Sequence, residues 1–114
     1  MDKCIFCQII EHKIPAQIVL ENEEIIAFRD INPQAPVHIL IIPKKHISSL
    51  IELNKNHDEL IGQICRVAKE LAKKESIDSS GFRLVVNTGP NAGQAVNHIH
   101  FHLLGGRKLK WPPG

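Results

Sequence analysis

Several features that would assign a protein to a particular class are missing from this sequence. No apolar run approaches the ~20 residues that a membrane-spanning helix requires, so no membrane span is expected. The first ten residues, MDKCIFCQII, lack the long apolar stretch and small-residue cleavage site of a secretory signal peptide. The net charge of +2 at pH 7 is too small to indicate nucleic acid as the default partner.

Cysteine is also scarce, since the chain has three, an odd number. Without an export signal, a disulfide framework is not expected, and reduced thiols or a bound metal are favoured. We therefore expect an intracellular, cytoplasmic protein.

What the chain does contain is ordinary for a soluble globular protein. Hydrophobic residues make up 43% and charged residues 23% of its 114 residues. This length suffices for one domain with a real core, and no repeat, low-complexity tract or linker is present. We therefore expect a single domain over residues 1–114.

The apolar pattern predicts one long helix among several strands. Residues 56–75 carry apolar side chains at helical spacing, and Asn56 with Glu59 resembles a capping box at their start. A short helix is expected over 3–11, and two prolines predict a loop over 31–36. Strands are expected over residues 17–22, 25–30, 37–43, 82–87 and 95–104. Strands grouped before and after one long helix favour an α+β fold with a mainly antiparallel sheet.

Three of the seven histidines, His98, His100 and His102, alternate with apolar residues in NHIHFHLLG. On a strand, alternate residues share a face, so the three rings line one face and the intervening apolar residues face the helix. The outer two Cα atoms would lie ~13 Å apart, too far for all three to share one metal ion. Three core histidines would each need a polar partner, which makes simple core packing a poor explanation. The pattern favours a surface where imidazoles act on an anionic group.

The loop before these histidines suggests which anion that is. NTGPNAGQA contains Gly89 and Gly93, which would let backbone N–H groups approach a phosphate closely. Asn87 adds a side-chain donor or, equally, is a turn residue at a strand end. A phosphate group is therefore the expected anion.

The N-terminal segment CIFC places Cys4 and Cys7 at the C-x-x-C spacing of a zinc ligand pair. The alternative is a pair of small thiols without a metal. The third cysteine, Cys65, lies between Ile64 and Ala68 of the predicted helix and is expected in the core.

The segment GQAVNHIHFHLLGGR, residues 93–107, resembles the signature of the histidine triad family, in which three histidines alternate with apolar residues. The Gly-Gly-Arg and the final KLKWPPG are similar to the Hint branch of that family. CIFCQIIEHKIPA, AFRDINPQAPVHILIIPKKHI and FRLVVNTGP extend the resemblance over nearly the whole chain. It implies a five-stranded sheet with one long and one short helix, joined across a homodimer into a ten-stranded sheet.

The resemblance also implies an activity, namely hydrolysis of the P–N bond of purine nucleoside 5′-phosphoramidates to release AMP or GMP and an amine. His100 would be the nucleophile and form a nucleotidyl-histidine intermediate. His102 would stabilise the phosphate and leaving group, with His98 and His38 in supporting positions. Three alternatives stay open: a dinucleoside polyphosphate hydrolase, a nucleotidyl transferase, and a nucleotide-binding scaffold without catalysis.

A nucleoside site is implied in the same way. Asp30 would hold the ribose hydroxyls, for which a carboxylate is a suitable acceptor. Apolar walls around the base, or else plain core, are implied for Ile5, Phe6, Phe28 and Ile31. Contacts to the phosphate are implied for Asn87, Gly93, Gln94 and Ala95, and contact with the partner's site for Trp111.

Relatives with this cysteine pair close a tetrahedral zinc site with two histidines, which correspond here to His46 and His98. Such a Cys2His2 set would be structural and would leave His100 and His102 available. The chain departs from the Hint pattern at Ala95, where many members have a serine whose hydroxyl lies near the phosphate and leaving group. We therefore expect an active but slower enzyme.

Overall fold

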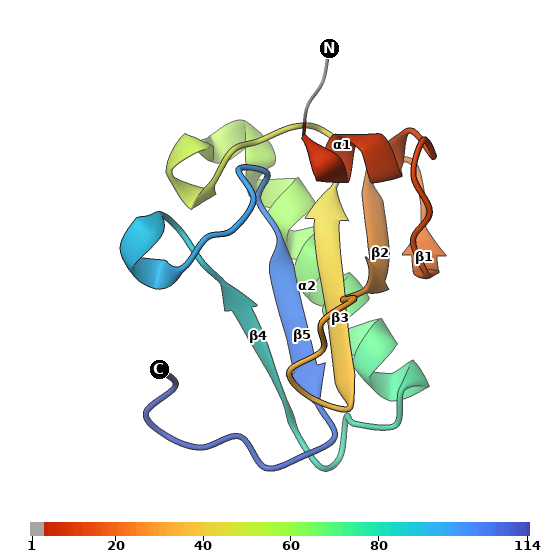
Figure 1. Cartoon of the computed structure of the whole chain (residues 1–114), viewed down its shortest axis with the longest axis vertical. Helices are drawn as coiled ribbons and strands as arrows, with labels where there is room; N and C mark the ends of the chain where they lie inside the picture. Colours follow the sequence, from red (N-terminus) through yellow and green to blue (C-terminus); the bar gives the residue numbers. More distant parts are fainter. Residues whose placement is uncertain (1–3) are drawn as a thin grey trace.

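The computed structural model describes residues 4–114, which form a five-stranded antiparallel sheet with one long and one short helix (Figure 1). The strand order is β1-β2-β3-β5-β4, and every neighbouring pair is antiparallel. The elements are α1 (Ile5–Ile10), β1 (Ile18–Glu21), β2 (Ile25–Arg29), β3 (Val37–Pro43), α2 (Asp58–Lys74), β4 (Phe82–Val86) and β5 (Phe101–Gly105). The predicted α+β class and antiparallel sheet are confirmed. The predicted helix start at residue 3 lies outside the described residues.

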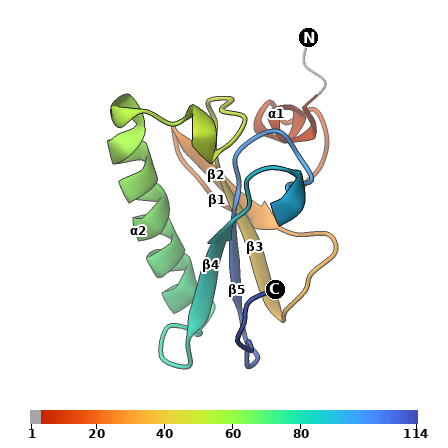
Figure 2. The same ribbon diagram turned by 90° about the vertical axis from the view of Figure 1, so that its left-hand side faces the viewer.

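The two faces of the sheet are covered differently. The long helix α2 packs along one face, and α1 lies over the end of the opposite face (Figure 2). The central strand β3 is buried over its whole length, as expected for a strand covered on both sides. Its side chains alternate between two cores, since Ile39 and Ile41 join the α2 side and Leu40 and Ile42 join the α1 side.

The helix α2 buries one stripe of its surface. Its buried residues recur at helical spacing: Ile64, Val67, Ala68, Leu71 and Ala72. The predicted capping box was wrong, because Asn54 and His57 form it instead, around the short 3₁₀ turn Lys55–His57 that precedes α2. The predicted burial of Cys65 was also wrong, because its position lies at the flank of the stripe and is exposed.

The last strand is shorter than predicted. β5 begins at Phe101, whereas residues 95–100 form an irregular approach to it, with the Ile99 N–H donating to the carbonyl of Ile47 at 2.7 Å. The alternation of faces nevertheless holds, because Ile99, Phe101 and Leu103 all join the core beneath α2. The histidines between them therefore lie on the α1 side of the sheet.

No described helix combines the length and the apolar character needed to cross a bilayer.

Candidate functional site

His100 is buried immediately before β5, and its ring orientation is fixed by one hydrogen bond. Its Nδ1 lies 2.8 Å from the carbonyl oxygen of His98. Because a carbonyl oxygen can only accept, Nδ1 carries the proton and Nε2 of the neutral ring carries the lone pair. The Phe6 ring packs edge-on against this imidazole, with centroids 5.1 Å apart. The His100 imidazole therefore has a fixed orientation and one basic nitrogen, Nε2.

His102 belongs to a chain of hydrogen bonds that determines its tautomer. The backbone N–H of Gln34 donates to Nδ1 of His38 at 3.0 Å, so the proton of a neutral His38 is on Nε2. That Nε2 lies 2.9 Å from Nδ1 of His102 and donates to it. The proton of His102 is consequently on Nε2, a buried atom that has no hydrogen-bond partner among the described residues. A buried donor left in this way is suited to an oxygen atom of a ligand.

Burial and neighbouring rings keep His102 neutral. Burial, together with the nearby His100 and His38 rings, lowers the pKa of His102 to about 4, and the Asp30 carboxylate opposes this only in part. Burial likewise lowers the pKa of His38, again against the influence of Asp30. At neutral pH the pair therefore adds hydrogen-bond donors and no fixed charge to the site.

Asp30, His38 and His102 bring a carboxylate oxygen and two ring nitrogens within 4.8 Å of one another, a grouping that resembles a metal site. The hydrogen bonds argue against that role. With Nδ1 of His38 accepting from Gln34, a metal at Nε2 would require the His38 ring to lose its last proton. We therefore regard Gln34, His38 and His102 as a hydrogen-bonded relay, with a carboxylate oxygen of Asp30 3.4 Å from Nε2 of His38.

A largely apolar cavity of about 300 Å³ opens in front of His100 and His102. Six of the predicted nucleotide-site residues line it: Ile5, Phe6, Phe28, Asp30, Ile31 and Ala95. Asp30 adds a carboxylate to the lining, and one of its oxygens accepts from the N–H of Asn32 at 2.8 Å. The volume lies at the lower end of the range for small-molecule sites.

Other predicted residues lie outside this cavity. Asn87, Gly93, Gln94 and Trp111 are absent from its described lining, as are the supporting His98 and His38. Trp111 is 81% exposed, so most of its ring surface faces solvent.

The cavity also has walls that the sequence reasoning missed: Ile9, Ile14, Pro15, Ala16, Arg29, Leu40 and Val96. One of them, Leu40, could have been predicted from the sequence. It lies two residues after His38 on the same strand, and alternate strand residues share a face. It pairs directly with His102 across β3 and β5.

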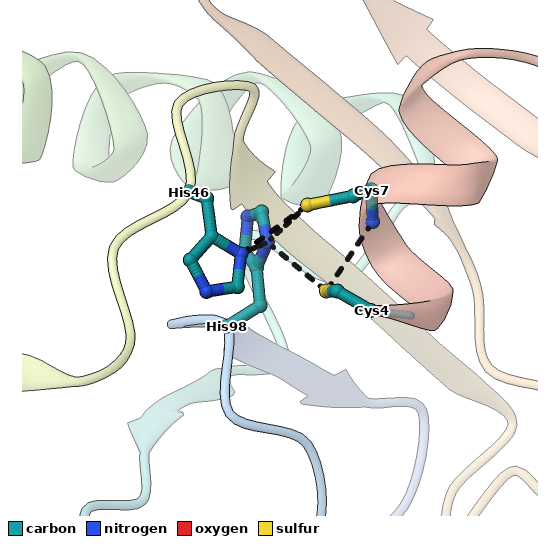
Figure 3. Close-up of side chains that lie close together, drawn as sticks. All are labelled: Cys4, Cys7, His46 and His98. Atoms are coloured by element: carbon teal, nitrogen blue, oxygen red, sulfur yellow. Dashed lines mark hydrogen bonds between the residues drawn. The ribbon is translucent and has the colours of Figure 1, made fainter. Parts of the chain in front are cut away.

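Cys4, Cys7, His46 and His98 converge at the end of the sheet under α1 (Figure 3). Nδ1 of His98 lies 3.5 Å from each cysteine sulfur and 3.1 Å from Nδ1 of His46, which is itself 3.2 Å from the Cys7 sulfur. Tetrahedral zinc would separate its ligands by ~3.3 Å between nitrogens and ~3.6 Å between sulfur and nitrogen. The four donor atoms therefore fit a zinc ion with little rearrangement.

Local hydrogen bonds and helix α1 orient these donor atoms toward one another. Nε2 of His98 lies 2.8 Å from the carbonyl oxygen of Pro43 and donates to it, which leaves Nδ1 unprotonated and directed at the sulfurs. Cys4 is the N-cap residue of α1 and Cys7 lies in its first turn, so a single short helix supplies both thiols. His46 follows β3 and is exposed, so the cluster is open to solvent on its side.

The chain is similar to several known proteins. Residues 3–110 match the family model described as scavenger mRNA decapping enzyme C-term binding. A 14 kDa zinc-binding protein from Zea mays is 51% identical over 112 residues, covering 96% of this chain and 87% of that protein. The adenylylsulfatase HINT1 of Arabidopsis thaliana is 46% identical over 112 residues, with 96% and 76% covered.

One solved structure is similar to almost the whole of this chain. The crystal structure of a HIT family hydrolase from Legionella pneumophila Philadelphia 1 has a TM-score of 0.97 and 52% sequence identity. The match covers 98% of this chain and 100% of that one.

Proposed function

The chain belongs to the histidine triad family, and from this we propose that it is a Hint-type hydrolase of purine nucleoside 5′-phosphoramidates. The observation that carries the proposal is the hydrogen bond from Nδ1 of His100 to the carbonyl of His98. It leaves the lone pair on Nε2 of a ring that lines the cavity, which is what a nucleophile requires.

The reaction would proceed in two displacements at the α-phosphorus. Nε2 of His100 forms a bond to phosphorus while the P–N bond to the amine breaks, and the leaving amine takes up a proton. Water then attacks phosphorus and releases one proton, which balances the proton taken up by the amine. The bond to Nε2 breaks, and the nucleoside monophosphate leaves with His100 restored. Two easier steps replace one difficult one, which is the usual advantage of covalent catalysis.

His102 would act on the phosphoryl oxygens and leaving group. Its Nε2–H is a preorganised donor, held by the relay from Gln34 through His38. Such donors stabilise charge that develops in the transition state. An anionic phosphate beside His102 would also raise its pKa above the value of about 4 in the free protein and so promote protonation of the departing amine.

The rest of the cavity would hold the nucleoside. The apolar walls from α1 and β2, including Phe6 and Phe28, suit the flat face of a base. Asp30, which also lines the cavity, would accept hydrogen bonds from the ribose hydroxyls. Asn87 and Gly93 lie in the adjacent loop, from which phosphate contacts of the bound state would come.

We further propose that Cys4, Cys7, His46 and His98 bind one structural zinc ion. Zinc would supply a closed four-ligand crosslink here and no catalytic water, because all four positions are protein ligands. The crosslink would tie α1, which forms one wall of the cavity, to the segment that carries His100. Thiolate ligands require a reducing compartment, which supports a cytoplasmic location for a single-domain protein.

A homodimer is proposed from the edge strand β4. Its outer edge has no partner strand among the described residues, and Phe82 at its start is 39% exposed. The C-terminal segment runs past this edge, where the Arg83 side chain donates to the carbonyl of Lys110 at 3.0 Å (Figure 1). Pairing of two β4 strands would join the two sheets into one of ten strands and bring Trp111 toward the partner's cavity.

One comparison favours a second substrate class, because the Arabidopsis relative is named an adenylylsulfatase. The same two displacements would release sulfate in place of an amine from adenylyl sulfate.

The deciding experiment offers the purified protein an adenosine 5′-phosphoramidate, adenylyl sulfate or a diadenosine polyphosphate and measures AMP by chromatography. AMP from the phosphoramidate at the highest kcat/KM supports the proposal. Turnover of the polyphosphate alone would support the dinucleoside hydrolase alternative. AMP binding without turnover of any substrate would indicate a nucleotide-binding scaffold.

A further inference from the structure

The side-chain amide of Gln94 makes three hydrogen bonds, all with the protein backbone. Its Oε1 accepts from the backbone N–H of Gly89 at 3.0 Å. Its Nε2 donates to the carbonyl oxygens of Ser48 at 2.7 Å and Val96 at 3.0 Å. Sequence resemblance suggested a contact between Gln94 and the phosphate, but both ends of its amide already have partners. Gln94 therefore serves a different purpose from its neighbour Ala95, which lines the cavity.

These bonds join the two candidate sites. Ser48 lies two residues after His46 of the metal-binding cluster, and Val96 lines the nucleotide cavity. A second link runs parallel to the first, because the N–H of Ile99 donates to the carbonyl of Ile47 at 2.7 Å. The segment 46–48 is thus fastened to the segment 94–99 by backbone and side-chain bonds.

The side-chain chemistry at this position is restrictive. Two carbonyl oxygens require a group with two N–H donors, and one backbone N–H requires an acceptor on the same side chain. Only glutamine has both at this length. Glutamate, which has nearly the same shape, would place a carboxylate oxygen against the carbonyls of Ser48 and Val96, and methionine would leave all three partners unpaired.

We propose that Gln94 is a positioning residue that couples nucleotide binding in the cavity to metal retention in the Cys4, Cys7, His46 and His98 cluster. The inference rests on the proposed function, since it needs both ligands to bind. A nucleotide that orders residues 94–96 would, through Gln94, hold the segment bearing the exposed ligand His46 in place. Coupling between two binding sites is reciprocal, so the metal would strengthen nucleotide binding by the same factor.

The test measures zinc release from the zinc-loaded protein into a chromogenic chelator, with and without saturating AMP. In the wild type, AMP should slow release roughly fivefold or more, and removal of zinc should weaken AMP binding by calorimetry to a similar extent. In Gln94→Glu and Gln94→Met, the effect of AMP on release should fall below about twofold. Gln63→Glu makes the same charge change on a partly exposed side chain of α2, where it likewise removes an amide hydrogen bond, the one to Glu24, and should keep the wild-type effect.

The outcomes separate this proposal from the proposed function. Zinc and AMP that both bind the wild type without affecting each other would overturn the coupling alone, as would a full AMP effect in Gln94→Glu. Loss of the effect in Gln94→Glu but not in Gln94→Met would also overturn it, because added charge and not the lost hydrogen bonds would then be the cause. Failure of zinc or AMP to bind the wild type would refute the proposed function and the coupling with it. If Gln94→Glu does not fold, Gln94→Met decides by the same measurement.

Discussion

Nδ1 of His100 donates a hydrogen bond to the carbonyl oxygen of His98, whose own ring nitrogen Nδ1 faces Cys4 and Cys7. One residue therefore serves two sites, with its side chain in the metal cluster and its backbone holding the nucleophile. The position of the His98 backbone determines where the His100 ring lies. The state of the cluster should consequently affect catalysis without a direct contact to substrate.

Replacing Cys4→Ser and Cys7→Ser together should remove about one zinc ion per chain. The melting temperature should fall by about 5 °C or more, because a metal bound only by the folded state contributes its binding energy to stability. Metal analysis and thermal melts check this, with Cys65→Ser as the control because Cys65 is exposed on α2. Wild-type protein without metal, or a double variant with an unchanged melting temperature, would refute the zinc site.

Ala95→Ser tests the departure from the Hint pattern. The added hydroxyl at the cavity wall should raise kcat more than it changes AMP affinity, since a donor that acts on developing charge works mainly in the transition state. The gain should approach ~10²-fold for poor leaving groups, although a water that already fills the place would reduce it. Steady-state kinetics with good and poor amine leaving groups measure it. A serine variant that is no faster with any substrate would make Ala95 a neutral replacement.

The low pKa of His102 predicts how stability depends on pH. The unfolded residue titrates near 6.5 and the folded one at about 4, so between these values the unfolded chain binds more protons. Stability should therefore fall as the pH decreases from about 6.5 to about 4, and the lowered pKa of His38 acts in the same direction.

Chemical denaturation of wild type and His102→Gln at pH 7 and pH 5 isolates this contribution, because both proteins carry the same metal cluster. The variant should lose less stability than the wild type on acidification. Equal losses would show that His102 titrates normally in the folded protein.

Much of the fold could be predicted because it follows from side-chain periodicity. The apolar stripe of α2 and the uninterrupted apolar run of β3 each predicted their element directly. The start of β5 could not be predicted, because residues 95–100 have strand-like alternation but their backbone bonds go to Ile47 and Gln94 in place of a neighbouring strand. Such tertiary hydrogen bonds leave no periodic signal in the sequence.

The site shows the same division. Alternation placed His100 and His102 on the face opposite the core beneath α2, and the cysteine spacing indicated a metal ligand pair. The relay through Gln34 and His38 depends on a loop N–H that meets a ring nitrogen, which spacing cannot reveal. Likewise, the complete use of the Gln94 amide became visible only with Ser48 beside it.

Deleting residues 109–114 tests the role of the C-terminal tail. The segment lies beyond β5, so the protein should fold with a nearly unchanged melting temperature. Preference among amine leaving groups should change, because Trp111 is exposed in its own chain and is proposed to approach the partner's cavity. Relative kcat/KM values for several phosphoramidates check this, with removal of residues 113–114 as the control that keeps Trp111. Identical preferences in the two truncated proteins would argue against a role for the tail.

The most direct test of the account is to trap the nucleotidyl enzyme during turnover of an adenosine phosphoramidate and to locate the label by mass spectrometry. The wild type should carry one nucleotidyl group on His100. His100→Asn keeps a donor for the His98 carbonyl but lacks the nucleophile, so it should bind AMP, form no adduct and turn over more than about 10³-fold slower. His12→Asn, which changes an exposed histidine with a positive φ of 60°, should behave as the wild type. A label on another residue, or His100→Asn turnover within tenfold of the wild type, would contradict the central claim.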